Sequence, residues 1–377
     1  SGSQADASLT LTINTGKVGS RATAWDGTNS PTTTQENTIN RLTVGIFDAS
    51  TKKVKTIVEL TSATTGGNSL SVSGNTATAK IVTTSLATGD DVLVAANAPA
   101  GNFAGVADET GFNAKTEGIE SAVLSSPDNT KEINTNIPMY GASTLNGSGS
   151  AFTATVSVQH QLAKITLDNL SVDFAQDGPY KSATFKPTEF FLVNVPENLA
   201  FNKEAVNGTN HFHGCNIASS DYSSLSWITS LPSNWGSYKE FLATGALSGS
   251  ALSGIASSGT EKYGSKSFFY VTPSTDDTDN GKMKLIIAGD FDANGSGTTE
   301  KVFYPVAINA TYDAAGNATA ADGGTVFQVS PNKNYKCTVV IKTKGTTDPT
   351  KNLDPQTATV TVTVTDFVDA SQTTTFE

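Results

Sequence analysis

A stretch near the end of the chain alternates strictly between apolar residues and threonine. It covers residues 357–365, and its apolar members are Ala358, Val360, Val362 and Val364. Successive side chains of a strand point to opposite faces, so this pattern predicts a β-strand with one apolar and one polar face. The β-branched residues also favour the extended backbone. A strand so close to the end of a chain can pair within its own domain or with a neighbouring molecule.

Similar patterns recur along the chain between polar turns. In residues 8–15, Leu9, Leu11 and Ile13 share one face of an alternating strand. Residues 92–96 form a continuous apolar run, which predicts a central strand buried on both faces. Further strands are expected at residues 39–48, 55–60, 76–84, 152–170, 185–195, 268–271, 282–288, 302–311 and 335–342.

The other segments between these strands predict turns and loops. Residues 103–121 have room for one short helix, and residues 137–141, with a proline and a glycine, predict an irregular link. The segment 197–265 is rich in Ser, Gly and Asn and predicts loops with short elements. A loop of that length in a compact domain often has a function.

These patterns together predict an all-β protein. The 377 residues suffice for two hydrophobic cores. We expect two tandem antiparallel β-sandwich domains with long loops and at most short helices. The Gly/Ser-rich segment 146–150 predicts a flexible turn at the boundary. The expected organisation is an N-terminal strand and processing segment (1–21), a first domain (22–150) and a second domain (151–377).

Charge and composition exclude several classes of protein. The formal net charge is −11 and no run of basic residues occurs, so the sequence predicts no nucleic-acid partner. No apolar run approaches the length of a membrane-spanning helix. Phosphate-binding, Gly-x-Ser-x-Gly and His-Glu-x-x-His motifs are absent, so we expect neither a cofactor nor hydrolase chemistry.

The segment that follows the first strand is polar through residue 36 and predicts an exposed loop. Exposed loops of small residues are where proteases cut. Arg21 lies in this loop, and the other arginine of the chain, Arg41, falls in a predicted strand. An arginine-specific protease would therefore meet one accessible target. The alternative is that Arg21 is an ordinary surface residue.

Two motifs imitate metal sites. Asp290, Asp292 and Asn294 begin like a calcium loop, but Lys301 stands where the loop needs a glutamate, and a β-turn fits better. His211, His213 and Cys215 alternate like zinc ligands, but no fourth ligand is evident. We therefore expect no metal.

Two other features leave alternatives open. Cys215 and Cys337 could form one long-range disulfide, although two separate buried thiols are the simpler interpretation. Trp227, Trp235 and Tyr238 would suit a glycan-stacking surface, but burial beneath the long loop is the simpler interpretation for the tryptophans.

Several motifs, in this order, resemble the Bacteroidetes fimbrillin family, the subunits of type V pili. ENTINRLTVGIFD at residues 36–48 resembles the family's first core strand, VLVAANAP at 92–99 its V-x-x-x-A-N strand, and IPMYG at 137–141 its I-P-M-x-G element. LAKI at 162–165 resembles the strand that opens its second domain. NKNYK at 332–336, GTTDP at 345–349 and the final Val-Thr repeat match its C-terminal end. Phe367 stands where the family usually has tryptophan. The resemblance spans nearly the whole chain.

The resemblance implies a mechanism of assembly. Fimbrillins are exported as lipoproteins to the outer membrane, through an acylated cysteine upstream of the residues present here. An arginine-specific protease then removes the N-terminal strand and opens a hydrophobic groove. The C-terminal segment of another subunit fills this groove by donor-strand exchange. The implied partners are other copies of the chain or related pilins, the protease, and host or bacterial surface receptors.

Specific residues take these roles by resemblance. Arg21–Ala22 would be the cut bond. Leu9, Leu11 and Ile13 would lie on the displaced strand, and their burial accounts for about 5–9 kcal/mol of apolar stabilisation. The donor candidates are Val360, Val362, Val364, Phe367, Val368 and Phe376. The sequence thus predicts an adhesive, non-enzymatic pilus subunit at the cell surface. The alternatives are an accessory or tip subunit of the same pilus, and a secreted glycan-binding β-sandwich module.

Overall fold

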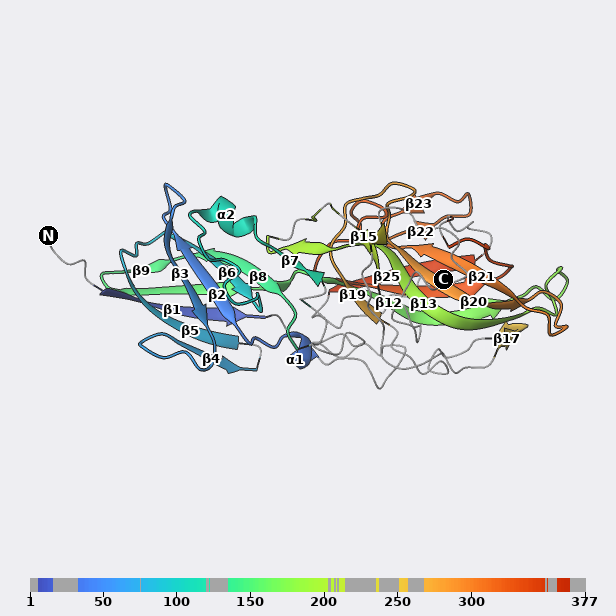
Figure 1. The fold of residues 1–377 in the computed structure, drawn as a ribbon, viewed down its shortest axis with the longest axis horizontal. Coiled ribbons are helices and arrows are strands. Elements are labelled where there is room, and N and C mark those ends of the chain that lie inside the picture. The colour runs from blue at the N-terminus through green and yellow to red at the C-terminus, as the bar shows by residue number, and fades with distance from the viewer. Residues whose placement is uncertain are drawn as a thin grey trace.

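The structure, a computed structural model, describes residues 6–15, 33–74, 76–119, 122, 135–202, 205–206, 208, 210–213, 235–236, 251–256, 268–349, 351 and 358–366. Its sheets form two groups that lie side by side along the long axis of the molecule (Figure 1). Two helices are described over their full length, α1 (Thr33–Glu36) and α2 (Glu109–Asn113), and each is a single turn. The prediction of an all-β protein with at most short helices is therefore confirmed. None of these helices is long and apolar enough to cross a membrane.

The N-terminal group consists of two facing five-stranded sheets. The first has the order β4 (Ser69–Ser73), β5 (Thr76–Thr84), β1 (Asp6–Asn14), β10 (Ala151–Ser157), β9 (Asn146–Ser148). The second has the order β11 (Gln159–His160), β8 (Met139–Thr144), β6 (Asp91–Ala96), β2 (Leu42–Phe47), β3 (Val54–Leu60). One hydrophobic cluster contains residues of both sheets, so apolar burial between them holds this group together.

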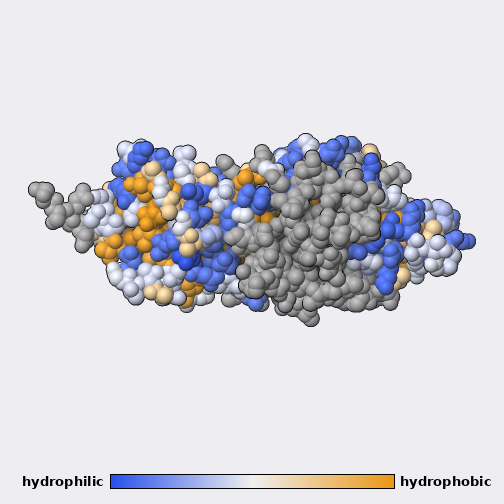
Figure 2. Space-filling view, in the orientation of Figure 1, coloured by the Kyte–Doolittle hydropathy of each residue, from blue (hydrophilic) through white to orange (hydrophobic). Residues whose placement is uncertain are grey.

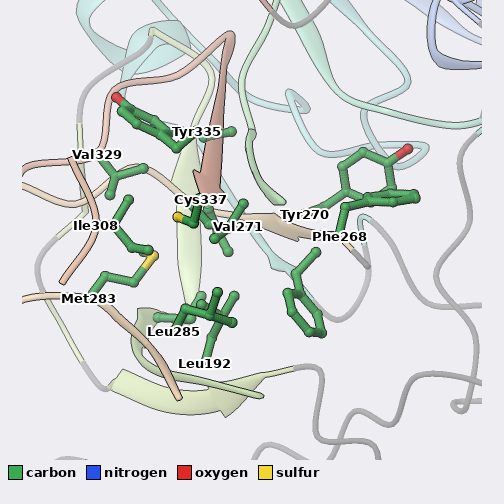
Figure 3. Close-up of a cluster of buried hydrophobic side chains, with 14 of the residues drawn as sticks. Leu192, Phe268, Tyr270, Val271, Met283, Leu285, Ile308, Val329, Tyr335 and Cys337 are labelled. Atoms are coloured by element: carbon green, nitrogen blue, oxygen red, sulfur yellow. The ribbon is translucent and has the colours of Figure 1, made fainter. Parts of the chain in front are cut away.

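The C-terminal group also contains two main sheets. The first has the order β18 (Ile255–Ala256), β12 (Ala163–Asp173), β24 (Lys333–Ile341), β25 (Ala358–Asp366), and β19 (Phe268–Val271) also pairs with β12. The second has the order β16 (Trp235–Gly236), β15 (Asn210–His213), β13 (Thr184–Pro196), β20 (Lys284–Asp292), β21 (Glu300–Ala307), and β17 (Leu252–Ser253) also pairs with β13. Side chains from both sheets meet in one core, where Leu192, Leu285 and Cys337 lie near one another (Figure 3). A small sheet of β22 (Thr311–Tyr312) and β23 (Ala318–Thr319) lies outside both.

Several strand pairs are parallel, which the prediction of antiparallel sandwiches did not include. They are β1 with β10, β12 with β24 and β15 with β16. Parallel neighbours need long crossover connections. Hydrophobic alternation is the same for both directions of pairing, so the sequence pattern alone could not reveal the crossovers.

Two local predictions were wrong. Residues 137 and 138 lie outside any strand, but residues 139–141 of the predicted irregular link belong to β8, Met139–Thr144, which lies beside β6. This strand position requires glycine, because a Cβ at residue 141 would approach the Ser157 carbonyl oxygen to 2.3 Å. The long strand expected at 152–170 is divided, and β10 and β11 pair with strands of the N-terminal group. We therefore propose that the domain boundary lies between His160 and Ala163 rather than after Ser150.

The two groups are joined by backbone pairing and by aromatic contacts. The strands β7 (Thr116–Gly118) and β14 (Asn198–Ala200) form an antiparallel pair between them. The ring of Phe103 stacks on Phe112 with centroids 4.1 Å apart, and contacts Phe201 edge-on at 5.3 Å. All three rings are buried. The cluster that fills the C-terminal group therefore extends into the N-terminal group.

Asn97 fastens the loops at one end of the N-terminal group. It follows β6, is 2% exposed and has a φ of 62°, a conformation that asparagine tolerates better than most residues. Its amide Nδ2 donates to the carbonyl oxygens of Thr38 and Ile137, at 2.8 and 2.9 Å. Its Oδ1 accepts from the Asn40 backbone N–H at 2.8 Å. One side chain therefore holds the segments that lead into β2 and β8.

Replacing Asn97 with alanine should lower the free energy of unfolding by about 2–4 kcal/mol, because buried backbone groups lose their partners. Asn97→Gly loses the same bonds but accepts the positive φ, so it should be about 1 kcal/mol less damaging than alanine. Urea denaturation of both variants tests this. Equal losses in the two variants would contradict the contribution from backbone conformation.

Candidate functional site

The strand β1 lies inside its sheet and has a neighbour on each side. Residues 6–14 pair antiparallel with β5, and residues 8–14 pair parallel with β10. Leu9, Leu11 and Ile13 are fully buried, whereas Ser8 and Thr10 are exposed. The predicted strand and its apolar face are therefore present at the predicted residues.

Loss of β1 would leave a long groove in the first sheet. Its floor would be the apolar cluster that Leu9, Leu11 and Ile13 now complete, and its walls would be the backbones of β5 and β10. The N–H and C=O groups of those walls would lose their partners, which is unfavourable where water has poor access. Such a groove accepts an extended strand with large apolar side chains at alternate positions.

The N-terminal group also carries hydrophobic surface on the face seen in Figure 2. Among the described residues, the large hydrophobic side chains that are exposed are Val72 on β4, 45% exposed, and Val82 on β5, 47% exposed. Isolated residues of this kind are common on protein surfaces and indicate no site by themselves.

Among the described residues, the strand β25 lies at the edge of its sheet and pairs with β24. Val360, Val362 and Val364 lie opposite Val339, Cys337 and Tyr335 in the antiparallel register. Val362 is 5% exposed and belongs to the C-terminal core. The predicted strand is therefore present, and it is paired within its own chain. Phe367, Val368 and Phe376, like the expected cleavage residues Arg21 and Ala22, lie outside the described residues.

A buried polar cluster holds the residues that precede β2. Glu36, at the end of α1, is 3% exposed, and both of its carboxylate oxygens lie 2.9 Å from Lys164 Nζ on β12. The Tyr270 hydroxyl on β19 donates to Glu36 Oε2 at 2.7 Å. Lys164 Nζ also lies 4.8 Å from the centre of the Phe268 ring. The cluster joins the start of the N-terminal group to two strands of the C-terminal group.

His160 completes this cluster from β11. Its ring is fully buried, and Nε2 lies 2.8 Å from the backbone carbonyl oxygen of Glu36. A carbonyl only accepts, so Nε2 carries the proton of the neutral ring. Burial lowers the pKa of His160 to about 4, and the nearby Lys164 charge acts in the same direction.

The calcium-like motif forms a turn that is closed by its own backbone. The carboxylate of Asp292 accepts backbone N–H groups from Asn294, Ser296 and Gly297. These hydrogen bonds lower the pKa of Asp292. Lys301, at the position where the loop would need a glutamate, forms an ion pair with Glu189 at 2.9 Å. Among the described residues, no group of three His, Cys, Asp or Glu side chains could hold a metal ion.

The remaining candidates form no assembled site in the described residues. Cys337 is a buried free thiol, and burial raises its pKa to about 12, so the thiolate that redox chemistry needs is disfavoured. His211 and His213 lie on β15, which pairs with β16 at Trp235. The other residues of those two predictions, Cys215, Trp227 and Tyr238, lie outside the described residues.

Sequence reasoning missed the buried cluster around Glu36. Glu36 and Lys164 are 128 residues apart, and neither lies in a recognisable catalytic or ligand motif. Each was noticed only as part of a strand motif. The available signal was that both are charged residues beside strongly apolar segments, where a charge is tolerated only with a partner.

A family comparison matches the first part of the chain. The model of the major fimbrial subunit protein (FimA) family matches residues 7–168. This span includes all the strands of the two N-terminal sheets, β1 among them, and the start of β12. No curated protein sequence matches the chain.

Solved structures share the fold over almost the whole chain. A candidate cell adhesion protein from Bacteroides eggerthii has 20% identity and a TM-score of 0.61, covering 97% of both chains. A fimbrilin from Porphyromonas gingivalis has 18% identity and a TM-score of 0.58, covering 97% of this chain and 99% of its own. A candidate cell adhesion protein from Parabacteroides distasonis has 15% identity and a TM-score of 0.59, covering 97% of this chain and all of its own. At these identities the similarity establishes a common fold.

The packing of β1 can be measured by truncating its buried side chains. Leu11→Ala should lower the free energy of unfolding by about 2–5 kcal/mol, because it leaves a cavity between the two sheets. Thr10→Ala, on the exposed face of the same strand, should change it by less than about 0.5 kcal/mol. Urea denaturation provides both values. Similar effects of the two substitutions would contradict the buried face assigned to β1.

His160 should make the protein sensitive to mild acid. Its pKa is about 4 in the folded protein and near 6.5 in the unfolded chain. The unfolded chain therefore binds a proton first as the pH falls. This contribution to stability is complete above pH 6.5 and declines between pH 6.5 and 4, by at most about 1.4 kcal/mol per pH unit. Urea denaturation across this range should show a shallower pH dependence for His160→Gln than for the wild type. Identical slopes would contradict this role for the ring.

Proposed function

We propose that this chain is a structural, non-enzymatic pilus subunit that polymerises by protease-triggered donor-strand exchange. Residues 7–168 match the model of the major fimbrial subunit protein (FimA) family, which supports the proposal. In this proposal cleavage after Arg21 releases β1, and residues 358–377 of another copy, or of a related pilin, occupy the groove. The observation that carries the proposal is the position of β1, which is fully buried and has a neighbour on each side.

The sequences of the two strands support the exchange. Residues 7–14 read ASLTLTIN, and residues 358–365 read ATVTVTVT. Both begin with alanine, continue with a large apolar residue at every second position, and have Ser, Thr or Asn between. In register, Val360, Val362 and Val364 replace Leu9, Leu11 and Ile13. The donor is therefore of suitable length and pattern, although each valine fills less space than the residue it replaces.

Backbone pairing provides a driving force. Within the part of the chain that the structure describes, β24 is the one strand that pairs with β25. In the groove the same strand would pair with both β5 and β10, and its free edge would disappear. The exchange therefore adds backbone hydrogen bonds and covers apolar surface, while the loss at β24 is limited to one edge. Residues after Asp366, with Phe367, Val368 and Phe376, offer further apolar side chains that could enter the groove without β25 leaving β24.

Proteolysis gives the exchange its direction. Before cleavage β1 is tethered to the chain, so it competes with any donor at a high effective concentration. After cleavage the released segment is diluted, and a donor that arrives meets no tethered competitor. The family resemblance further predicts export as a lipoprotein to the outer membrane and binding to surface receptors, and these remain predictions.

Digestion of the full chain with an arginine-specific protease tests the proposal. Mass spectrometry should find a cut after Arg21, and the unheated product should form a ladder of oligomers on a denaturing gel that heat dissolves. Arg21→Ala should stay monomeric, whereas the matched control Arg41→Ala should form the ladder. A peptide of residues 5–15 added in excess should suppress the ladder, because it refills the groove.

Two deletions separate the donor candidates. A protein that lacks residues 367–377 polymerises only if β25 is sufficient, whereas one that lacks residues 358–377 should accept a donor but supply none. Mixed with intact cleaved protein, the second deletion should shorten the ladder. Quantitative cleavage after Arg21 that leaves only monomers would contradict polymerisation by self-exchange and favour an accessory or tip subunit. Protection of Arg21 would contradict the trigger.

A further inference from the structure

In the sequence, one arginine of the chain precedes Glu36 and the other follows it. Arg21 is the proposed cleavage residue, and Arg41 lies directly before β2. The Arg41 side chain is 31% exposed and pairs with Glu59 at 3.2 Å. An ion pair so close to the surface contributes little to stability, and it does not shield the arginine from a protease. Protection of the Arg41–Leu42 bond must therefore come from the backbone around it.

Proteases bind several residues in an extended conformation, so they cut a folded segment only after it opens locally. The backbone of residues 38–41 is held by Asn97, whose side chain bonds Thr38 and Asn40 and whose N–H donates to the Arg41 carbonyl oxygen at 2.8 Å. These contacts hold residues 38–41. Local opening that begins at a cut after Arg21 and proceeds along the chain would therefore disrupt the cluster around Glu36 before it disrupted these contacts.

The cluster is built to resist such loosening. The Glu36 carboxylate contacts Lys164 and Tyr270 on two strands of the other group, and its backbone carbonyl contacts His160 on β11. Lys164 and Glu36 are both buried, so separating these opposite charges in a poorly hydrated site costs free energy. The Tyr270 ring stands beside Phe268 at the edge of the C-terminal core (Figure 3).

We propose that Glu36, held by Lys164, Tyr270 and His160, is an anchor that confines release of the N-terminal segment to residues before α1 and protects the Arg41–Leu42 bond from the same protease. The biological role of this anchor rests on the proposed cleavage after Arg21. The contacts that form the anchor do not depend on that cleavage. With Glu36 in place, the chain after residue 36 stays attached to the C-terminal group and β2 stays in its sheet. Without it, the segment from residue 33 to Arg41 opens and becomes a second substrate.

The experiment compares cleavage of the full-length wild type, Glu36→Gln and Tyr270→Phe by an arginine-specific protease. The fragments are identified by mass spectrometry over time. In the wild type the Arg41–Leu42 bond should remain intact after Arg21 is fully cut. Glu36→Gln removes the buried carboxylate that faces Lys164 and should raise the rate of cleavage after Arg41 by on the order of a hundredfold. Tyr270→Phe removes one neutral donor and should have a smaller effect of several-fold.

Two controls separate an anchor from general destabilisation. Glu189→Gln breaks the ion pair with Lys301 in the C-terminal group and should leave Arg41 protected. Hydrogen exchange of Glu36→Gln should increase over residues 33–41 without a matching increase in β13, β20 and β21. Continued protection of Arg41 in Glu36→Gln, or equal exposure of Arg41 in Glu189→Gln, would overturn the anchor. Failure of the protease to cut Arg21 in the wild type would count against the proposed function alone, because the exposure of Arg41 can still be measured.

Discussion

The N-terminal sandwich depends on the two-sided backbone pairing of β1. In the order β4-β5-β1-β10-β9, the strands on either side of β1 form separate antiparallel pairs, β4 with β5 and β9 with β10. Isolated two-stranded pairs are marginally stable in water. Without β1 this sheet would consist of two such pairs, joined only by their packing on the facing sheet. The same strand supplies three fully buried apolar side chains to the common core. A vacated β1 position is therefore an unstable state that favours rapid refilling by any strand of suitable pattern.

The two ends of the chain meet different constraints. β1 is interior and β25 is at an edge, although their sequences are close to interchangeable in pattern. An edge strand with one neighbour is easier to remove than an interior strand with two, because fewer hydrogen bonds break. The same pattern of residues therefore occurs once in an interior strand with two described neighbours and once in a strand with one described neighbour.

Much of the fold was predictable because it depends on local patterns. Alternation located β1, β5 and β25 closely, and the apolar run at 92–96 correctly predicted β6, whose residues are almost all buried. The errors arose where a long-range contact decides the conformation. Gly141 was interpreted as the end of a regular element, but it lies within β8. A glycine is needed there because the Ser157 carbonyl leaves no room for a side chain. The parallel partner of β1 and the ion pair between Glu36 and Lys164 each join residues more than a hundred positions apart. No single-sequence pattern contains that information, so the apolar face of β1 was predicted but the cluster around Glu36 was not.

The arrangement of the sheets limits how far the loss of β1 can spread. β1 belongs to one sheet of the N-terminal group, whereas β2, the next strand in the chain, lies in the other, between β6 and β3. That second sheet does not depend on β1 for any backbone pair. It is also fastened to the C-terminal group, through the β7–β14 pair, the aromatic contact of Phe103 with Phe201, and the cluster around Glu36. Opening the first sheet therefore leaves a continuous, supported structure behind it.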